Sequence, residues 1–228
     1  MPVAGPYTAG PVSPGTIANL VQGLVIMILS LSVHEWAHAY TAYRLGDDTA
    51  ARLGRLTLNP LAHIDPIGTL LIPAFGALSG VPVFGWANPV PVNPLRFRRD
   101  VNMWRGMAWT AAAGPASNFV MAILGAALLR LLVAFLRGSG SEGPLVRAGL
   151  EFLFGVIQVN VMLGLFNLLP IPPLDGSRLL PRSLDRYQAI AGRYSFLLLM
   201  LVIATPVGTP LFLLVRLATS TLTGFALG

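Results

Sequence analysis

Long apolar runs separated by short polar segments dominate the chain. The four apolar regions cover 16–44, 106–136, 146–169 and 194–227. The first opens with 18 residues, Thr16 to Val33, that carry no charge, and the last is interrupted by PVGTP at 206–210. A run of about 20 apolar residues is long enough to cross a bilayer as a helix. The pattern therefore predicts an all-α polytopic membrane protein with about four to six transmembrane helices.

The region between the first two long runs, 57–95, does not read as a regular span. Its apolar runs are short, and Pro and Gly punctuate them between Pro66 and Trp86. Arginine distribution distinguishes a full crossing from re-entry. A full crossing divides the loop arginines as 8 against 5, whereas a re-entrant segment divides them as 11 against 2. Basic residues accumulate on the cytoplasmic side of membrane proteins, so we expect re-entry and an extracytoplasmic N-terminus.

Composition supports the membrane assignment, with 54% hydrophobic and 11% charged residues. The net charge of +6 comes from 15 basic residues, and every one of them is Arg. In a soluble protein this charge would suggest nucleic-acid binding, but here the arginines flank apolar spans and report topology. We expect no nucleic-acid partner and a single domain over 1–228. There is no Cys, so a metal site must use nitrogen and oxygen ligands.

The first apolar run ends in a motif with metal-binding chemistry. His34, Glu35 and His38 have the H-E-x-x-H spacing, which on a helix places two imidazoles one turn apart on one face beside a carboxylate. Such groups inside a span cost a few kcal/mol each, so they indicate function. His34 lies ten residues before Arg44, about 15 Å along a helix and near the middle of the membrane. The motif predicts one Zn²⁺ with Glu35 as the general base.

Catalytic zinc takes three protein ligands, and two residues compete to be the third. Asp175 follows the span 146–169 in the Pro-rich loop 170–177, where an extended backbone can turn its carboxylate inward. The same Asp could instead cap a helix that starts near Ser177. His63 is a lone histidine in a loop, a position that is more often structural or solvated. We therefore favour Asp175.

Two further features are candidates for substrate contact. Asn118, which follows a helix-loosening Gly-Pro pair, could donate to a developing negative charge, or it could bond a neighbouring helix. The stretch 86–93 alternates Pro with Val, and an edge strand there could pair with an unwound substrate through Asn88, Val90 and Val92. A Pro-rich connecting loop is the alternative. The first interpretation adds a short membrane-associated β edge or hairpin to the predicted fold.

Five motifs in order resemble the site-2 protease family of intramembrane zinc metalloproteases, and look most like its short bacterial members without PDZ or CBS domains. They are HEWAH at 34–38, GRLTLNPLAHIDPIGTL at 54–70, GWANPVPVNP at 85–94, AGPASN at 113–118 and FNLLPIPPLDG at 166–176. The loop at 85–94 departs from the family pattern, because Asn88 stands where Lys is usual. That difference puts in doubt only a charge-dependent role of this position.

The resemblance implies that His34, His38 and Asp175 bind zinc and that Glu35 activates the water. It implies a multi-pass protein of the bacterial inner (plasma) membrane, with the site toward the cytoplasm, that cleaves transmembrane segments of single-span proteins. Anti-sigma factors, pro-sigma factors and remnant signal peptides are the substrate types of the family. Rival interpretations are a metal-transporting membrane protein and an inactive homologue that holds transmembrane partners. The single metal centre argues against the first, and the intact Glu35 against the second.

Overall fold

The computed structural model describes residues 14–79, 86–139 and 143–228, and this part of the chain is helical without a strand. The α-helices are α1 (Pro14–Arg44), α2 (Thr49–Arg52), α3 (Ile72–Ser79), α4 (Met103–Ser139), α5 (Pro144–Asn167), α6 (Asp175–Arg178), α7 (Asp185–Arg193), α8 (Ser195–Ala204) and α9 (Thr209–Leu227). A π-helix, η2 (Pro66–Leu71), precedes α3. Short 3₁₀ turns are η1 (Pro60–Ala62), η3 (Pro94–Arg96), η4 (Arg182–Leu184) and η5 (Pro206–Gly208).

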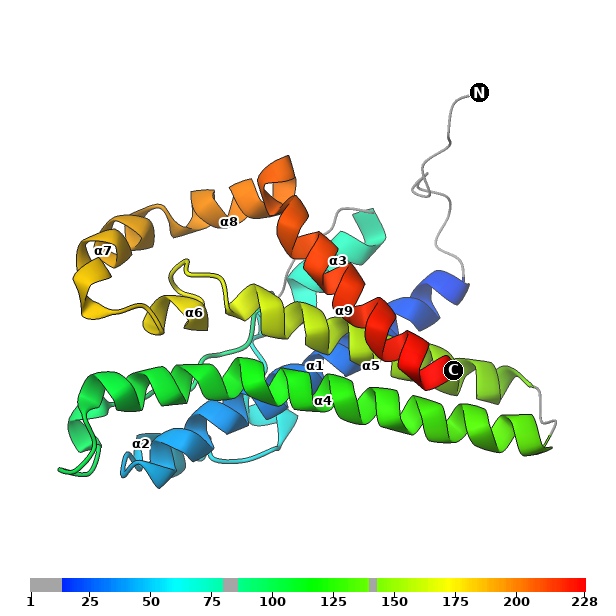
Figure 1. Ribbon diagram of the computed structural model, residues 1–228, viewed down its shortest axis with the longest axis horizontal. Helices are drawn as coiled ribbons and strands as arrows, with labels where there is room; N and C mark the ends of the chain where they lie inside the picture. The colour runs from blue at the N-terminus through cyan, green and yellow to red at the C-terminus, as the bar shows by residue number, and fades with distance from the viewer. Residues whose placement is uncertain (1–13, 80–85, 140–142) are drawn as a thin grey trace.

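Among the described residues, four helices are long and apolar enough to cross a membrane. They are Ile17–Arg44, Met103–Gly138, Pro144–Asn167 and Pro206–Leu227. A fifth candidate is the pair Arg182–Arg193 and Ser195–Ala204, which is bent by 77°. The apolar region 194–227 is thus two helices, α8 and α9, that meet at η5 (Figure 1). These spans confirm the prediction of an all-helical, multi-pass membrane protein.

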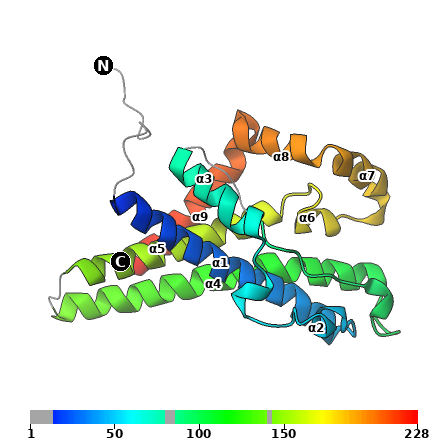
Figure 2. The same ribbon diagram turned by 180° about the vertical axis from the view of Figure 1, so that it is seen from behind.

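Helices α1, α4 and α5 form the centre of the molecule. α4 runs antiparallel to both neighbours, while α1 and α5 are parallel, because Ser30 contacts Asn160 and Ile26 lies beside Gly155. Small residues on these helices are almost completely buried: Ala39, Ala42, Ala111, Ala122 and Ala126. Small side chains let membrane helices approach closely, where packing rather than water exclusion provides the attraction. Figure 2, which views the molecule from behind, shows α1 lying across α4.

The chain between α1 and α4 returns to the end of the bundle from which it leaves. The backbone N–H of Arg98 donates to the carbonyl of Leu45 at 2.9 Å, so the start and the end of this excursion meet. Its apolar helical stretch, Pro66–Gly76, is shorter than a span. Both observations agree with re-entry, which stays the prediction from the arginine distribution.

The predicted β edge or hairpin is wrong for the described residues of this region. Residues 86–93 run as irregular backbone, the alternative of a Pro-rich connecting loop. Their available N–H groups are used elsewhere: Trp86 donates to Gly68, Asn88 to the carbonyl of His63, and Val90 to Glu35. The donors of this stretch go to separate acceptors, and its prolines have no N–H, so the stretch does not form a regular ladder of strand hydrogen bonds.

Candidate metal centre

Helix α1 presents both motif histidines on the face that packs against α4. The imidazoles of His34 and His38 meet edge to face, with ring centroids 4.6 Å apart. Their Nε2 atoms are 3.0 Å apart, and both side chains are buried. One turn of helix therefore brings two potential metal ligands to a single point, as the spacing predicts.

The third group at this point is Asp175, from the segment that follows α5. Its Oδ2 lies 3.1 Å from Nε2 of His34 and 3.2 Å from Nε2 of His38. Asp175 is the first residue of α6, whose N-cap is Leu174, and no side-chain hydrogen bond caps this helix. The capping role that its local sequence also allowed is not realised. Gly176 packs directly on the backbone of Leu168, which lets the loop fold this close to α5.

Each histidine is held from behind through Nδ1. Nδ1 of His38 lies 2.6 Å from the carbonyl oxygen of Thr110, and Nδ1 of His34 lies 2.6 Å from Oδ1 of Asn118. A carbonyl oxygen only accepts, so Nδ1 of His38 is the protonated nitrogen, and the orientation of Asn118 gives His34 the same tautomer. Both Nε2 atoms then face Asp175. In metal sites, hydrogen bonds of this kind fix the ring and its tautomer.

A chain of buried amides extends the support of His34 across three helices. The Asn118 amide N–H donates to Oδ1 of Asn160 at 2.9 Å, and the Asn160 amide donates to the hydroxyl of Ser30 at 2.8 Å. Asn118 and Asn160 are completely buried. Sequence reasoning missed Asn160, Ser30 and Thr110. Polar residues inside apolar spans were the available signal for the first two, whereas Thr110 acts through its backbone and leaves no such signal.

The geometry of Asn118 matches the alternative in which it bonds neighbouring helices. Its carbonyl oxygen faces His34 and its amide faces α5, so it lies behind the imidazole rather than on the open side of the cluster. Pro115, inside α4, has no N–H to offer the preceding turn, which loosens the helix near Thr110 and Asn118. The AGPASN motif thus shapes the wall against which His34 and His38 rest.

Glu35 lies beside the three-residue cluster. Its carboxylate is buried, and Oε2 accepts a hydrogen bond from the N–H of Val90 at 2.8 Å. Residues 86–93 therefore pass directly over the motif helix. Asn88 is exposed and its carbonyl accepts from Arg55, while Val92 is half-buried. Of the predicted substrate-contact residues in this loop, Val90 is the one that touches the motif.

His63 takes no part in the cluster. It is buried in the loop before η2, where its Nε2 donates to the carbonyl of Thr57 at 2.9 Å. Its own carbonyl accepts from the N–H of Asn88. Through these contacts His63 has a structural role, because it connects the region after α2 to the loop 86–93.

The cluster fits a zinc ion by its donor set and by the space around it. Within the described residues, His34, His38 and Asp175 form a group whose potential ligand atoms all lie within 4.8 Å of one another. Oδ2 of Asp175 is buried without a hydrogen-bond partner. Gly114 of α4 faces the cluster, and a Cβ there would lie 2.6 Å from Cε1 of His34. Two imidazoles and one carboxylate are ligands that catalytic zinc sites use.

Comparison with known proteins agrees with this chemistry. The sequence profile described as Peptidase family M50 matches residues 133–203. Three curated relatives have names that begin "Putative zinc metalloprotease". YwhC of Bacillus subtilis is 42% identical over 198 residues, 84% of each chain. Rip2 of Mycolicibacterium smegmatis is 35% identical over 78% of this chain and 65% of its own, and Rip2 of Mycobacterium tuberculosis H37Rv is 32% identical over 83% and 67%. No solved structure gives a significant match.

Proposed function

The chain belongs to peptidase family M50, the site-2 proteases, and on this premise we propose that it is a zinc-dependent endopeptidase that cleaves peptide bonds inside the membrane. In this proposal His34, His38 and Asp175 hold one zinc ion per chain, and Glu35 is the general base. Zinc is the metal named for the relatives, and the three side chains form the cluster described above.

One observation carries the proposal. With Nδ1 of both histidines turned to oxygen acceptors, three atoms that can bind a metal converge: Nε2 of His34, Nε2 of His38 and Oδ2 of Asp175. Buried acceptors that face one another are unfavourable unless a cation lies among them. The arrangement therefore supports a metal centre.

When bound, zinc supplies Lewis acidity, which activates water and polarises the scissile carbonyl. Glu35 performs the proton transfer. Its Oε2 accepts from the Val90 N–H, and Oε1 can take a proton from the attacking water and deliver it to the leaving amine. Asn118 and the Thr110 carbonyl keep both imidazoles in the tautomer that leaves Nε2 unprotonated. The burial of all four site side chains limits access of bulk water.

We assign transmembrane segments of single-span proteins as the substrate class. The motif lies within the span Ile17–Arg44, about 15 Å of helix from its polar end. A substrate helix must unwind before a peptide bond can reach this point, because helical backbone groups are already bonded. The loop beside Glu35, with Asn88, Val90 and Val92, is the surface that an unwound segment would meet. Regulated proteolysis of anti-sigma factors, pro-sigma factors or remnant signal peptides fits such an activity.

The arginine-rich end of the bundle sets the proposed orientation. This end would face the cytoplasm of a bacterial cell and the N-terminus would lie outside, because basic loops are retained on the cytoplasmic side. The site, which is nearer to the end of α1 than to its start, would then open toward the cytoplasm.

Cleavage by purified protein in detergent tests the proposed activity. A single-span substrate is incubated with wild type, with Glu35→Gln and with chelator-treated protein, and the products are read by mass spectrometry. Wild type should cleave within the transmembrane segment, and removal of the base or of the metal should lower the rate by at least about a hundredfold. Cleavage that persists in Glu35→Gln would rule out the proposed mechanism. Metal uptake without cleavage of any single-span protein would favour the transporter interpretation.

A further inference from the structure

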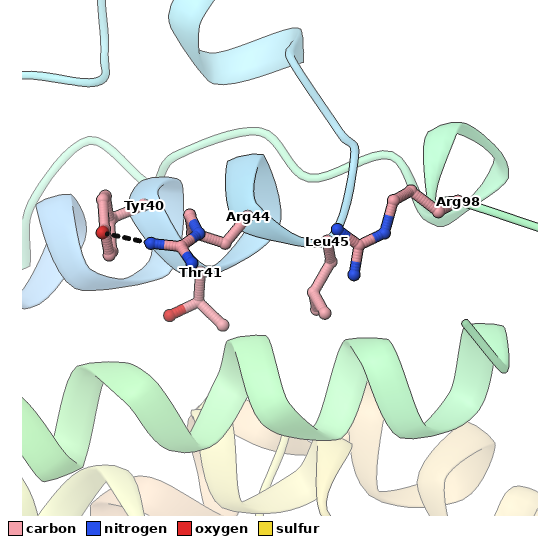
Figure 3. A pocket seen from close by; sticks show the side chains of 5 residues that line it. All are labelled: Tyr40, Thr41, Arg44, Leu45 and Arg98. Atoms are coloured by element: carbon pink, nitrogen blue, oxygen red, sulfur yellow. Dashed lines mark hydrogen bonds between the residues drawn. The ribbon is translucent and has the colours of Figure 1, made fainter. Parts of the chain in front are cut away.

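A second site lies at the polar end of α1, away from the metal centre. A cavity of about 400 Å³ is lined there by Tyr40, Thr41, Arg44, Leu45 and Arg98 (Figure 3). Two arginines and no acidic residue line it, so the cavity carries a charge of +2. Both arginines lie at or near the ends of candidate spans. Arg44 is the last residue of the first span, and Arg98 lies five residues before the start of the next.

The backbone holds the two arginine-bearing segments together. The Arg98 N–H donates to the carbonyl of Leu45 at 2.9 Å. Gly46 turns the chain with a φ of 109°, and a Cβ at this position would lie 2.9 Å from the backbone nitrogen of Arg98. A glycine is required here both for its left-handed conformation and for this close approach. The backbone thus brings the segments that carry Arg44 and Arg98 together at the cavity.

Neither arginine of the cavity is neutralised by a strong ion pair. Nη1 of Arg44 donates to the hydroxyl of Tyr40 at 2.9 Å, which holds the guanidinium in place. Arg98 has Asp100 at 3.6 Å, but both side chains are exposed, and such pairs contribute little.

The two carboxylates that follow Gly46 are occupied elsewhere. Asp47 accepts from Thr49 and from the Asn93 N–H. Hydrogen bonding to Arg52, with a further contribution from Arg96, outweighs desolvation and lowers the pKa of the Asp48 carboxyl, so this group stays ionised and paired. The positive charge of the cavity is thus available to an external anion.

We propose that this cavity binds the phosphate group of an anionic phospholipid. The guanidinium fork of Arg matches phosphate oxygens geometrically, and basic pockets at the ends of membrane helices suit lipid headgroups. Arg44 and Arg98 supply the charge. The Tyr40 hydroxyl, which accepts from Arg44, keeps its own proton for a phosphate oxygen, and Thr41 adds a second hydroxyl. The inference concerns a site separate from the proposed metal centre and does not depend on catalytic activity.

Native mass spectrometry of the full chain, released from nanodiscs, tests this site. Nanodiscs contain equal parts of phosphatidylcholine and phosphatidylglycerol, and bound lipids are counted for wild type and for the double variant Arg44→Gln/Arg98→Gln. The matched control, Arg99→Gln/Arg105→Gln, removes the same charge from neighbouring positions that do not line the cavity. Wild type and control should retain phosphatidylglycerol selectively, and the double variant should bind it roughly tenfold to thirtyfold more weakly.

The other outcomes of this experiment contradict the proposal. Equal loss in the double variant and the control would show a general charge effect. Equal retention of both lipids by wild type would show that the cavity does not distinguish lipids by headgroup charge. In a separate arm, inorganic phosphate is titrated into protein in neutral detergent; tight binding there, without selectivity among lipids in nanodiscs, would assign the cavity to free phosphate. Thermal unfolding of each variant, followed by circular dichroism, verifies that the double variant is folded.

Discussion

At the scale of single residues, the metal centre depends on what holds the two imidazoles from behind. His38 is held by a backbone carbonyl that no substitution of Thr110 can remove, whereas His34 is held by the side chain of Asn118. The two ligands are therefore unequal targets for mutation. The Asn118 contact can be removed cleanly, and it is backed by Asn160 and Ser30.

Replacing Asn118 should change zinc binding according to whether the new side chain can accept a hydrogen bond. Asn118→Leu removes the acceptor for the His34 Nδ1–H and should weaken zinc binding by about 10- to 100-fold. Asn118→Asp keeps an acceptor at the same position and should retain most of the affinity. Competition with a fluorescent zinc chelator measures both variants. If Leu and Asp weaken binding equally, Asn118 acts only through packing.

Sequence alone could predict the three members of the cluster but not the residues that support them. The i, i+4 spacing of His34 and His38 determines that they share a helix face, and a Pro-rich loop after a long span brings Asp175 back toward the bundle. The partner of Asn118 depends on the register between α1 and α4, which no local pattern encodes. The sequence therefore left two interpretations of Asn118, and the packing of α4 between α1 and α5 distinguishes them.

At the scale of elements, the centre requires α4 to pass very close to α1. Gly114 makes this possible, because any side chain there would run into both histidines. Farther along the same helix, Gly138 has nothing within 4 Å of a built Cβ. The two glycines thus form a matched pair on one helix, one at the site and one in open space.

Gly114→Ala should disrupt the metal centre while leaving the helix intact. Alanine favours helix over glycine by up to about 1 kcal/mol, so the loss should come from displaced imidazoles rather than from unfolding of α4. We expect zinc content and cleavage to fall at least about tenfold in Gly114→Ala and to stay unchanged in Gly138→Ala. Metal analysis with circular dichroism separates the two effects. Normal zinc binding in a folded Gly114→Ala protein would contradict this view of the packing.

The loop 86–93 shows where pattern reasoning fails at this scale. Alternation of Pro and Val suggests a strand, but it does not indicate which groups will accept hydrogen bonds from the free N–H groups. In the fold these donors go to Gly68, to His63 and to Glu35. A contact to a catalytic-motif carboxylate, fifty-five residues away in sequence, could not be read from local residues.

At the scale of the whole molecule, the arginines are distributed very unequally between the two ends of the bundle. Eleven arginines lie in three segments at one end of the bundle. The segment 44–55 is at the end of α1, 96–105 is at the start of α4, and 178–193 comes after α5. The Arg98–Leu45 and Trp104–Leu180 hydrogen bonds connect these segments. Figure 1 shows α2, α6 and α7 toward that end, with the end of α4 and the start of α5 at the other.

Membrane orientation can be tested with unusual clarity because the chain contains no Cys. Single cysteines are introduced as Ser183→Cys, at the arginine-rich end, and as Gly143→Cys, at the start of α5. With a membrane-impermeant maleimide, Gly143→Cys should be labelled in intact spheroplasts, and Ser183→Cys only after lysis. The reverse pattern would place the arginine-rich end outside and overturn the proposed orientation.

The most direct test of the central claim is the zinc content of purified protein, measured by inductively coupled plasma mass spectrometry after dialysis. His34, His38 and Asp175 converge, whereas His63 is bonded within its own loop. We predict one zinc per chain in wild type and in His63→Ala, and less than about a tenth of that in Asp175→Ala. Full zinc occupancy in Asp175→Ala, or its loss in a folded His63→Ala protein, would contradict the assignment of this centre.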